Sequence, residues 1–344
     1  MKPTVHDIAE EAGVSLATVD RVLNGRPGVR APTRERVRAA IDKLGFVRDV
    51  AAANLAKGRV YPFTFIVPSN DNSFMLALRQ EIEAARYRGQ AERTRITLLT
   101  VPAFDADRLA EALLAAGHAD ERPAGIAVVA IESEPVRQAV RALVADGIPV
   151  VTLVSDLSES ARSHFAGVDN EAAGRTAASL MGRYLSDRSG GIAVIAGSLQ
   201  VRDHRQRLDG FMTVIRDSYP GLSVGPVLEG RDDPAEVHAL TGRLLDTEFR
   251  PLGIYSLGAG NRGLIRALAE ARPRGPLPRV IAHELTEHTR QALLDGLIDT
   301  VLNQDAGHEV RSAIRVLKAH ADGQAVIDGQ ERIRIDLFLK DNLP

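Results

Sequence analysis

The stretch "GVSLATVDRVLN" (residues 13–24) combines a glycine turn with a short helical pattern. Gly13 suits a tight turn, and Ser15 suits the position before a helix, where its hydroxyl can accept a hydrogen bond from a free backbone N–H. Helical spacing places three apolar side chains on a common face, namely Val19, Val22 and Leu23. The other face, expected to be exposed, carries Leu16, Ala17, Asp20 and Arg21.

Helical patterns flank this stretch on both sides. The first covers residues 5–12 and has an apolar face of Val5, Ile8, Ala9 and Ala12. The second begins at Thr33, ends before Gly45, and has an apolar face of Val37, Ala40, Ile41 and Leu44. Two short helices joined by a glycine-containing turn and braced by a third form the helix-turn-helix arrangement. The sequence therefore predicts an N-terminal helix-turn-helix domain over residues 1–47.

The charge of the chain is unevenly distributed. Residues 1–60 carry 11 Lys and Arg against 7 Asp and Glu, a net charge of +4, whereas the whole chain has a net charge of -2. A basic segment on an acidic body indicates a module that binds a polyanion. The alternative is a small helical cap with a solvated basic surface and no ligand.

A helix-turn-helix domain places its second helix in the major groove of DNA. Leu16 and Ala17 would then contact base edges or thymine methyl groups, and Arg21 would read a guanine or bind a phosphate. Short polar side chains nearby suit phosphate oxygens. These are Thr4, Ser15, Thr18 and Asn24.

Residues 1–46 resemble the N-terminal domain of the lactose-repressor (LacI/GalR) family of bacterial transcription regulators. The shared elements are "TVHDIAEEAGVS", "RVLNG", "TRERV" and "LGF", in order and at the family's spacing. One position departs from the family, because Asp20 stands where a serine is usual. A carboxylate beside DNA weakens phosphate attraction unless it accepts from a cytosine amino group or pairs with an arginine. The family's base-reading rules therefore do not fix the operator sequence.

The segment "RDVAAANLAKGR" (48–59) follows this domain. It is rich in alanine, but a helix this short is marginal without a partner. The resemblance implies that residues 48–60 form a hinge helix that orders on DNA and inserts Leu55 into the minor groove as an apolar wedge. The alternative is a plain linker helix with Leu55 packed on its own domain.

From residue 61 to 344 short apolar runs alternate with amphipathic segments. The runs, read as strands, are 63–68, 96–102, 125–131, 149–154, 191–197, 253–258 and 279–283. The helical segments include 105–117, 134–146, 170–187 and 203–218. Short apolar strands joined by helices predict parallel sheets covered on both faces. There are more units than one doubly wound sheet holds, so we expect an α/β fold with two lobes.

Polar residues gather after these strands, where ligands bind in such folds. The candidates are Asn70, Asn72, Phe74, Ser155, Asp156, Arg205, Arg207, Asn261, Glu284 and Gln304. Each alone is more often a loop residue or a helix cap. Together, planar donors and acceptors beside an aromatic ring suit a sugar or polyol. The two arginines also admit an anionic ligand.

Residues 61–344 are similar to the periplasmic-binding-protein-type (type I) sensor domain of the same family. The similarity is carried by "PSNDNSF", "GVDNEAAGR" (167–175), "RLDGF" (207–211) and "LNQD" (302–305). It implies that Asn72 and Phe74 hold the ligand and that Arg207 clamps a sugar. It also places Asn261, Glu284 and Gln304 near later contacts, although the family's usual patterns are absent around 258–263 and 283–286.

A competing motif lies late in the chain. Gly258, Gly260 and Gly263 form a GxGxxG between a strand and a helical run, and Glu284 follows 21 residues after the last glycine. This arrangement is typical of dinucleotide binding. A regulator that senses a dinucleotide is therefore the alternative function, and a glycine-rich turn without a nucleotide is the plain structural interpretation.

Other classes find no support in the sequence. The chain has no cysteine, and HExxH, GxSxG and P-loop motifs are absent, so we expect no metal, no cofactor and no enzymatic activity. No apolar run suits a signal peptide or a bilayer span, which predicts a cytoplasmic protein. We expect a transcription regulator, a repressor by the resemblance, that binds near-palindromic DNA as a homodimer or a tetramer. The sequence leaves open whether its effector is an inducer or a co-repressor.

Overall fold

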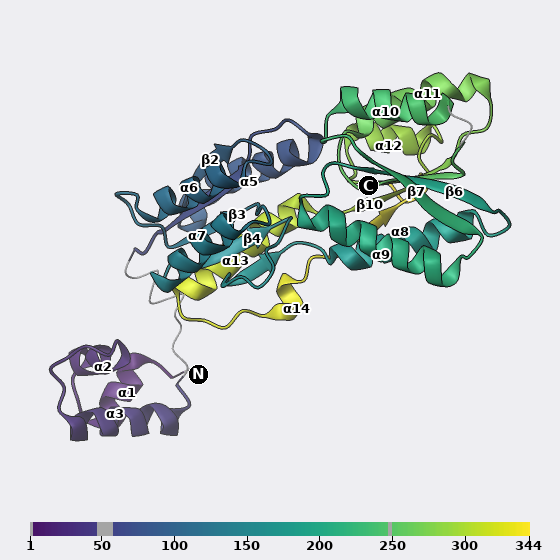
Figure 1. Ribbon diagram of the computed structural model, residues 1–344. Coiled ribbons are helices and arrows are strands. Elements are labelled where there is room, and N and C mark those ends of the chain that lie inside the picture. Colours follow the sequence, from purple (N-terminus) through teal and green to yellow (C-terminus); the bar gives the residue numbers. More distant parts are fainter. Residues whose placement is uncertain (1–2, 47–57, 247–249) are drawn as a thin grey trace. The chain divides into compact units, whose positions relative to one another are not determined.

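The chain forms two compact units, Met1–Arg59 and Val60–Pro344 (Figure 1). The computed structural model describes residues 3–46, 58–246 and 250–344. Within these ranges, no helix is both long enough and apolar enough to cross a membrane.

The described part of the first unit consists of three helices: α1 (Val5–Ala12), α2 (Leu16–Leu23) and α3 (Ala31–Leu44). Thr4 starts α1 with a reciprocal cap, because its hydroxyl accepts from the Asp7 N–H while the Asp7 carboxylate accepts from the Thr4 N–H. Ser15 starts α2 by accepting from the Thr18 N–H, as predicted. Gly13 and Gly45 end α1 and α3 in the left-handed conformation, with φ of 61° and 60°.

The core of this unit is small and draws on all three helices. Its fully buried members are Ile8, Ala12, Val19, Val37 and Ala40. This confirms the predicted apolar faces except at Val5, which is 39% exposed. Helix α3 begins at Ala31 and not at Thr33, since Pro32 in the first turn gives up no helical hydrogen bond.

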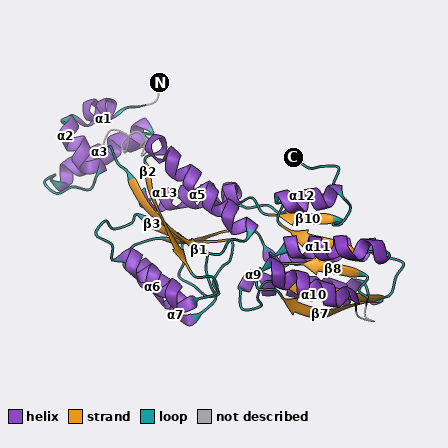
Figure 2. Cartoon of the chain, turned by 90° about the horizontal axis from the view of Figure 1, so that it is seen from above, coloured by secondary structure: helices purple, strands orange, loops and turns teal. Residues whose placement is uncertain are grey.

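The second unit contains two lobes, each built on one sheet. In the first lobe the strand order is β2-β1-β3-β4-β5, and all pairs are parallel. Helices α5 and α13 cover one face of this sheet, and α6 and α7 cover the other (Figure 2). The elements are β1 (Tyr61–Pro68), α5 (Ser73–Glu92), β2 (Thr94–Val101), α6 (Ala106–Gly117), β3 (Gly125–Val128), α7 (Glu134–Ala145), β4 (Val150–Leu153), β5 (His164–Ala166) and α13 (Ala306–Ala321).

In the second lobe the strand order is β11-β10-β9-β8-β6-β7, parallel except for the antiparallel pair of β10 and β11. Helices α8 and α9 cover one face, and α10, α11 and α12 cover the other. The elements are α8 (Asn170–Tyr184), β6 (Gly190–Ala196), α9 (Arg202–Ser218), β7 (Leu222–Glu229), α10 (Pro234–Asp246), β8 (Gly253–Ser256), α11 (Asn261–Ala271), the 3-10 turn η1 (Arg272–Arg274), β9 (Arg279–His283), α12 (Glu287–Leu294), β10 (Thr300–Asn303) and β11 (Asp336–Phe338).

The chain passes between the lobes three times. It leaves the first lobe after β5, returns from β10 through α13, and goes back to pair β11 with β10 after the short helix α14 (Asp328–Glu331). These crossings put the carboxyl ends of β1, β3 and β4 and those of β8, β9 and β10 next to inter-lobe segments. Side chains that follow these strands can therefore meet between the lobes.

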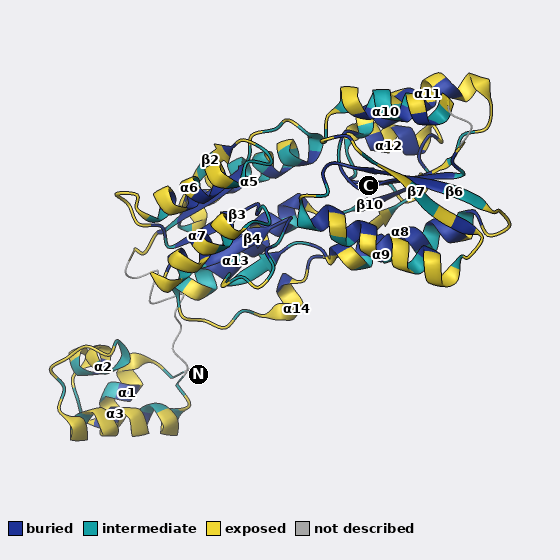
Figure 3. Cartoon of the chain, in the orientation of Figure 1, coloured by how far each residue is buried: buried dark blue, intermediate teal, exposed yellow. Residues whose placement is uncertain are grey.

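Alternation along the strands divides each lobe into two cores. In β1, Phe63, Phe65 and Val67 face α5 and α13, whereas Ile66 faces α6 and α7. Burial is nearly continuous along the central strands (Figure 3). This pattern is that of parallel sheets covered on both sides, and it confirms the predicted α/β fold with two lobes.

The strands and helices predicted within the described residues are all present, most of them with shifted ends, and the hinge helix predicted over 48–60 lies largely outside the described residues. The run at 125–131, for example, forms a strand only to Val128. Strands β5, β7, β10 and β11 were not predicted. Three of them have three or four residues, and β7 is interrupted by Gly225 and Pro226, so none shows a long apolar run.

Candidate functional site

The first candidate site is the exposed face of α2. Leu16 is 42% exposed, and Ala17 and Arg21 are exposed as well. Among the residues that the structure describes, the Arg21 side chain has no ion pair or hydrogen-bond partner. An arginine and two small or apolar groups on the first two turns of a helix are suited to base edges and thymine methyl groups.

Asp20, the departure noted in the sequence, is engaged within the same unit. Its carboxylate accepts from Arg26 Nη1 at 3.0 Å and from Asn24 Nδ2 at 2.7 Å. Arg26 therefore offsets the negative charge on this face, and the Asn24 amide is drawn toward Asp20. Thr4, Ser15 and Thr18 are also engaged, because their hydroxyls take part in helix caps. Leu55 lies outside the described residues.

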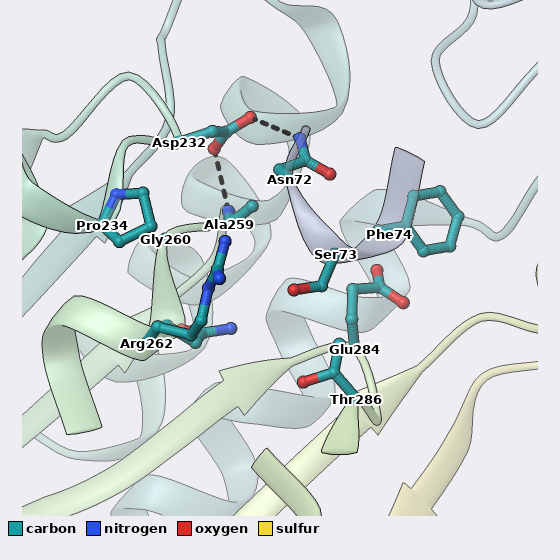
Figure 4. A pocket seen from close by; sticks show the side chains of 11 residues that line it. Asn72, Ser73, Phe74, Asp232, Pro234, Ala259, Gly260, Arg262, Glu284 and Thr286 are labelled. Atoms are coloured by element: carbon teal, nitrogen blue, oxygen red, sulfur yellow. Dashed lines mark hydrogen bonds between the residues drawn. The ribbon is translucent and has the colours of Figure 1, made fainter. Parts of the chain in front are cut away.

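The second candidate site is a cleft between the lobes of the second unit (Figure 4). The start of α5 contributes Asn72, Ser73 and Phe74, and the second lobe contributes Asp232, Pro234, Ala259, Gly260, Asn261, Arg262, Glu284 and Thr286. An adjoining hollow shares Phe74, Arg262 and Glu284 with the cleft and extends to Gln304 and the start of α13.

One hydrogen bond of the cleft joins the two lobes. Asn72 Nδ2 donates to Asp232 Oδ2 over 3.4 Å, while Asn72 Oδ1 caps α5 by accepting from the Met75 N–H at 2.8 Å. The other Asp232 oxygen accepts from the Ala259 N–H at 2.8 Å. Asp232 therefore ties the loop after β7 to the loop after β8 and to the first lobe.

Arg207 is buried on α9 and is 3% exposed. Its Nε donates to Asn170 Oδ1 at 2.7 Å, and its Nη1 donates to the Leu257 carbonyl at 2.9 Å. Close packing of α8 on α9 makes this possible, because a Cβ at Gly174 would lie 1.9 Å from the Arg207 carbonyl oxygen. No carboxylate of the described chain forms an ion pair with Arg207.

Glu284 and Gln304 form a buried pair after β9 and β10. Gln304 Nε2 donates to Glu284 Oε1 at 2.9 Å, and Gln304 is 5% exposed and Glu284 8% exposed. Burial raises the pKa of the Glu284 carboxyl to about 7, against the opposing influence of the Arg207 charge and the Gln304 hydrogen bond. Glu284 also has a φ of 70°, an uncommon conformation for this residue type.

Several buried polar atoms around this region have no partner among the described residues. All lie on loops that follow strands or on the first turns of helices that begin there. They are Asn70 Oδ1, Ser155 Oγ, Asp203 Oδ1, Glu284 Oε2, Gln304 Oε1 and both carboxyl oxygens of Glu309. Buried polar atoms are nearly always hydrogen-bonded in native proteins, so this concentration points to a ligand-binding site.

Comparisons with known proteins match both units of the chain. Residues 4–49 match the family model described as "Bacterial regulatory proteins, lacI family". Residues 63–325 match the one described as "Periplasmic binding protein domain". The chain belongs to the LacI family of bacterial regulatory proteins.

Relatives of this LacI-family chain are transcription regulators by name. The HTH-type transcriptional regulator MalR of Streptomyces coelicolor is 33% identical over 230 residues, which are 66% of this chain and 63% of that protein. The match thus spans less than two thirds of that relative's length. Catabolite control protein A of Priestia megaterium is 40% identical over 83 residues, 24% of this chain and 25% of that protein.

Solved structures share the fold of the second unit. A solute-binding protein of Burkholderia graminis in complex with D-arabinose gives a TM-score of 0.73 at 23% identity, covering 83% of this chain and 97% of that one. The glucose-galactose binding protein GanP of Geobacillus stearothermophilus gives a TM-score of 0.71 at 19% identity, covering 83% and 99%. At this identity the likeness shows the two-lobed fold alone.

The LacI-family cleft brings together only part of the predicted effector set. Asn72, Phe74, Asn261, Glu284 and Gln304 line it. The amide of Asn261 is satisfied by protein, because it donates to the His283 carbonyl at 2.9 Å and accepts from Ser256 Oγ at 2.7 Å.

Five predicted effector residues are not among those that line the cleft or the hollow, namely Asn70, Ser155, Asp156, Arg205 and Arg207. Two of them point elsewhere. Asp156 is held by Arg162 and by Thr152 Oγ1, the latter at 2.7 Å, so its carboxylate serves the loop after β4. Arg205 is exposed, and it lies two residues from buried Arg207 on α9, about 200° around the helix. The structure therefore does not place either side chain in the cleft.

Sequence reasoning overlooked Asp232 and Glu309 in this region, and it did not include Asp203 or Arg262 among the candidate effector residues. Arg262 stood in the sequence beside Asn261, and this was a usable signal. Asp232 follows a strand that was not predicted, and Asp203 and Glu309 lie within helical segments that read as ordinary surface helix. Their burial depends on contacts between distant parts of the chain.

The glycines of the GxGxxG motif have a packing explanation. A Cβ at Gly263 would lie 1.9 Å from the Pro234 carbonyl oxygen, one at Gly258 would lie 2.5 Å from the Gly197 nitrogen, and Gly260 has a φ of 86°. These glycines let α11 approach α10 and β6. In the part of the chain that is described, no group of three or more His, Cys, Asp or Glu could hold a metal ion.

Proposed function

We propose that this LacI-family chain is a repressor that binds near-palindromic operator DNA as a homodimer, with an operator affinity set by a small polar effector in the cleft of the second unit. The effector class favoured by the cleft is a sugar or polyol. The observation that carries the proposal is the combination, in one chain, of an exposed helix-turn-helix face and a cleft whose buried polar atoms lack partners.

The DNA contacts proposed are those on and around α2. Leu16, Ala17 and Arg21 would face base edges, and Arg26 would keep the Asp20 carboxylate from repelling phosphate. Thr4, Ser15 and Thr18 lie at the N-terminal ends of α1 and α2, where backbone N–H groups also favour phosphate, and Asn24 would reach a phosphate from the C-terminal end of α2. One such domain covers half of an operator, which is why a symmetric pair is expected. Leu55 would be the minor-groove wedge.

The effector contacts proposed are those of the cleft. Phe74 offers an aromatic face for the apolar side of a sugar ring, and Arg207, Glu284 and Gln304 offer donors and acceptors for hydroxyl groups. Asn70 and Ser155 add further polar atoms from the first lobe. The cleft has walls from both lobes, so an effector can fit one relative pose of the lobes better than another. Such an effector shifts the chain toward that pose and thereby changes its affinity for the operator. The effect is reciprocal, because operator DNA changes the affinity for the effector by the same coupling free energy.

The experiment has two arms. Selection from a randomised duplex library with the full chain should enrich a near-palindrome. A thermal-shift screen of sugars, polyols, nucleosides and NAD should identify a stabilising compound, which should then change the affinity for the selected DNA. If no DNA sequence were enriched, the proposal that the chain is a transcription regulator would be refuted. If NAD were the only compound that raised the melting temperature, the effector would be a dinucleotide and not a sugar or polyol.

A further inference from the structure

Most of the unpartnered buried polar atoms of the cleft region are acceptors. Those of Asn70, Asp203, Glu284, Gln304 and Glu309 are oxygens that accept hydrogen bonds, whereas the Ser155 hydroxyl can also donate and Arg202 Nη1 is a donor. The Gln304 assignment is fixed by its neighbour, since its Nε2 donates to Glu284 and its Oε1 is the atom left over. A ligand that satisfies this region must therefore supply hydrogen-bond donors.

The buried charge is one-sided as well. Asp203, Glu284 and Glu309 are 7%, 8% and 0% exposed, and the buried cation near them in the described chain is Arg207. His204 Nε2 lies 3.8 Å from Asp203 Oδ2, but His204 adds charge only when it is protonated. Buried charges need a partner of opposite sign or they become neutral. The region therefore has a deficit of positive charge.

Resting on the proposed function, we infer that the effector carries a protonated amine together with its hydroxyl groups, and that this ammonium binds at Glu284 Oε2 and Gln304 Oε1. An ammonium has three donors, no acceptor and a positive charge, so it answers both deficits at once. Gln304 is 95% buried, lines the hollow and has an oxygen free for this role. On the other side of the cleft the hydroxyl groups would meet Asn72, and the apolar side of the ligand would cover Phe74.

The titration of the carboxyls agrees with this assignment. Burial, followed by the charge of Glu284, raises the pKa of Glu309 well above its usual range, so the charged form of this carboxyl is disfavoured. Burial raises that of Glu284 to about 7, so a proton partly fills the place of a cation there. The charged groups that act on Glu284 or Glu309 include Asp203 and Arg207 of α9 and Asp305 just before α13. The hollow that Glu284 lines also carries titratable groups of α5, α11 and α12, namely Glu81, Arg262, Glu287 and His288.

Matched pairs of compounds test the inference. The full chain is titrated with glucosamine and glucose, galactosamine and galactose, mannosamine and mannose, and glucamine and sorbitol, at pH 7. In at least one pair the amine should bind at least about tenfold more tightly than its parent. We attribute this difference to an ion pair between the ammonium and Glu284 that is buried and therefore only weakly screened by solvent. Calorimetry in two buffers of different ionisation enthalpy should show proton release on binding of the amine.

Variants identify the site. Glu284→Gln keeps the shape of the side chain and should reduce the preference for the amine to about threefold or less and abolish the proton release. Glu270→Gln is the matched control. It replaces the same side chain, but in an exposed ion pair near the C-terminal end of α11, so this variant should keep the preference for the amine.

The inference is overturned if every parent sugar binds as tightly as its amine, if the preference survives in Glu284→Gln, or if no compound of any pair binds. These outcomes can be told apart from failure of the proposed function. If only the inference about the amine fails, the chain still selects an operator and responds to a neutral compound. If the proposed function fails, the chain selects no operator with any compound present.

Discussion

Gln304 Nε2 donates to Glu284 Oε1 over 2.9 Å, and the second oxygen of each side chain is buried without a partner in the described chain. The two residues follow adjacent strands, β9 and β10, whose register pairs His283 with Leu302. The sheet thus fixes the pair. One bond orients the amide, and both residues line the same hollow while the second oxygen of each stays buried.

The pair predicts a pH dependence of stability. In the native state the Glu284 carboxyl keeps its proton up to about pH 7, whereas the unfolded chain loses it near the usual glutamate value of about 4.3. The native state binds more protons between these values, so the free energy of unfolding contributed by Glu284 falls as the pH rises through this window and levels off above it. The fall amounts to about 3 kcal/mol.

Chemical denaturation of the wild type and of Glu284→Gln from pH 4 to 8 measures this contribution as a difference, which removes the titration of all other groups. Glu309→Gln is the comparison, since burial also raises the pKa of the Glu309 carboxyl well above its usual range, so the same linkage predicts that its difference curve falls as the pH rises. A flat curve for Glu284→Gln would show that Glu284 titrates like an exposed glutamate.

Local signals in the sequence predicted much of the fold. Gly13 ends α1 and Ser15 starts α2 through caps that involve residues within a few positions, so the local sequence reveals them. Long apolar strands such as β1 and β6 were equally visible. Placing polar residues after these strands also led to Asn72, Phe74, Glu284 and Gln304, because parallel strands bring their carboxyl ends to one edge.

The rest depends on long-range contacts. Glu309 lies in a helix whose return into the first lobe buries it completely, and nothing in its neighbours along the chain marks this. Arg205 and Arg207 are equivalent in the sequence, but the packing of α9 on α8 turns only one of them inward. Asp156 would have suited the cleft had Arg162 not captured it.

The close approach of α8 and α9 predicts a link between packing and effector binding. Gly174→Ala adds a Cβ that would lie 1.9 Å from the Arg207 carbonyl oxygen, so the helices must separate. We expect the free energy of unfolding to fall by about 1–3 kcal/mol and the response to the effector to weaken as Arg207 moves.

Gly242→Ala is the control, because the new Cβ of this α10 residue has no atom within 4 Å. Helix propensity should then stabilise the chain by up to about 1 kcal/mol. Denaturation and thermal shifts of the two variants test the comparison. Equal stabilities would mean that α8 and α9 adjust without cost.

Arg21 predicts how the first unit recognises DNA. Arg21→Ala should weaken binding to the selected operator by about 1–3 kcal/mol and binding to random duplex much less, if the guanidinium reads a base. Fluorescence anisotropy at several salt concentrations measures both. Arg266→Ala, which removes an exposed arginine of the second unit, should change neither. An equal loss on both duplexes, with a shallower salt dependence, would make Arg21 a phosphate contact.

The ion pair of Glu132 and Arg202 predicts an influence on the lobes from outside the cleft. Glu132 follows β3 in the first lobe, Arg202 begins α9 in the second, and Arg202 Nη1 lies 3.5 Å from Glu132 Oε2. The pair stabilises the pose in which the lobes approach. Glu132 is anchored independently, because it also accepts from Arg137 and from the Ser158 N–H at 2.7 Å.

Arg202→Met keeps the apolar stem and removes the charge. We expect the dissociation constant of the compound found in the thermal screen to rise about fivefold, which corresponds to about 1 kcal/mol for a half-buried pair. Stability without that compound should change by less, since each lobe keeps its own core and Glu132 keeps its other partners. Titration calorimetry and denaturation of the same sample separate the two effects. If the binding free energy of the compound and the free energy of unfolding fell by the same amount, Arg202 would act on folding and not on the pose of the lobes.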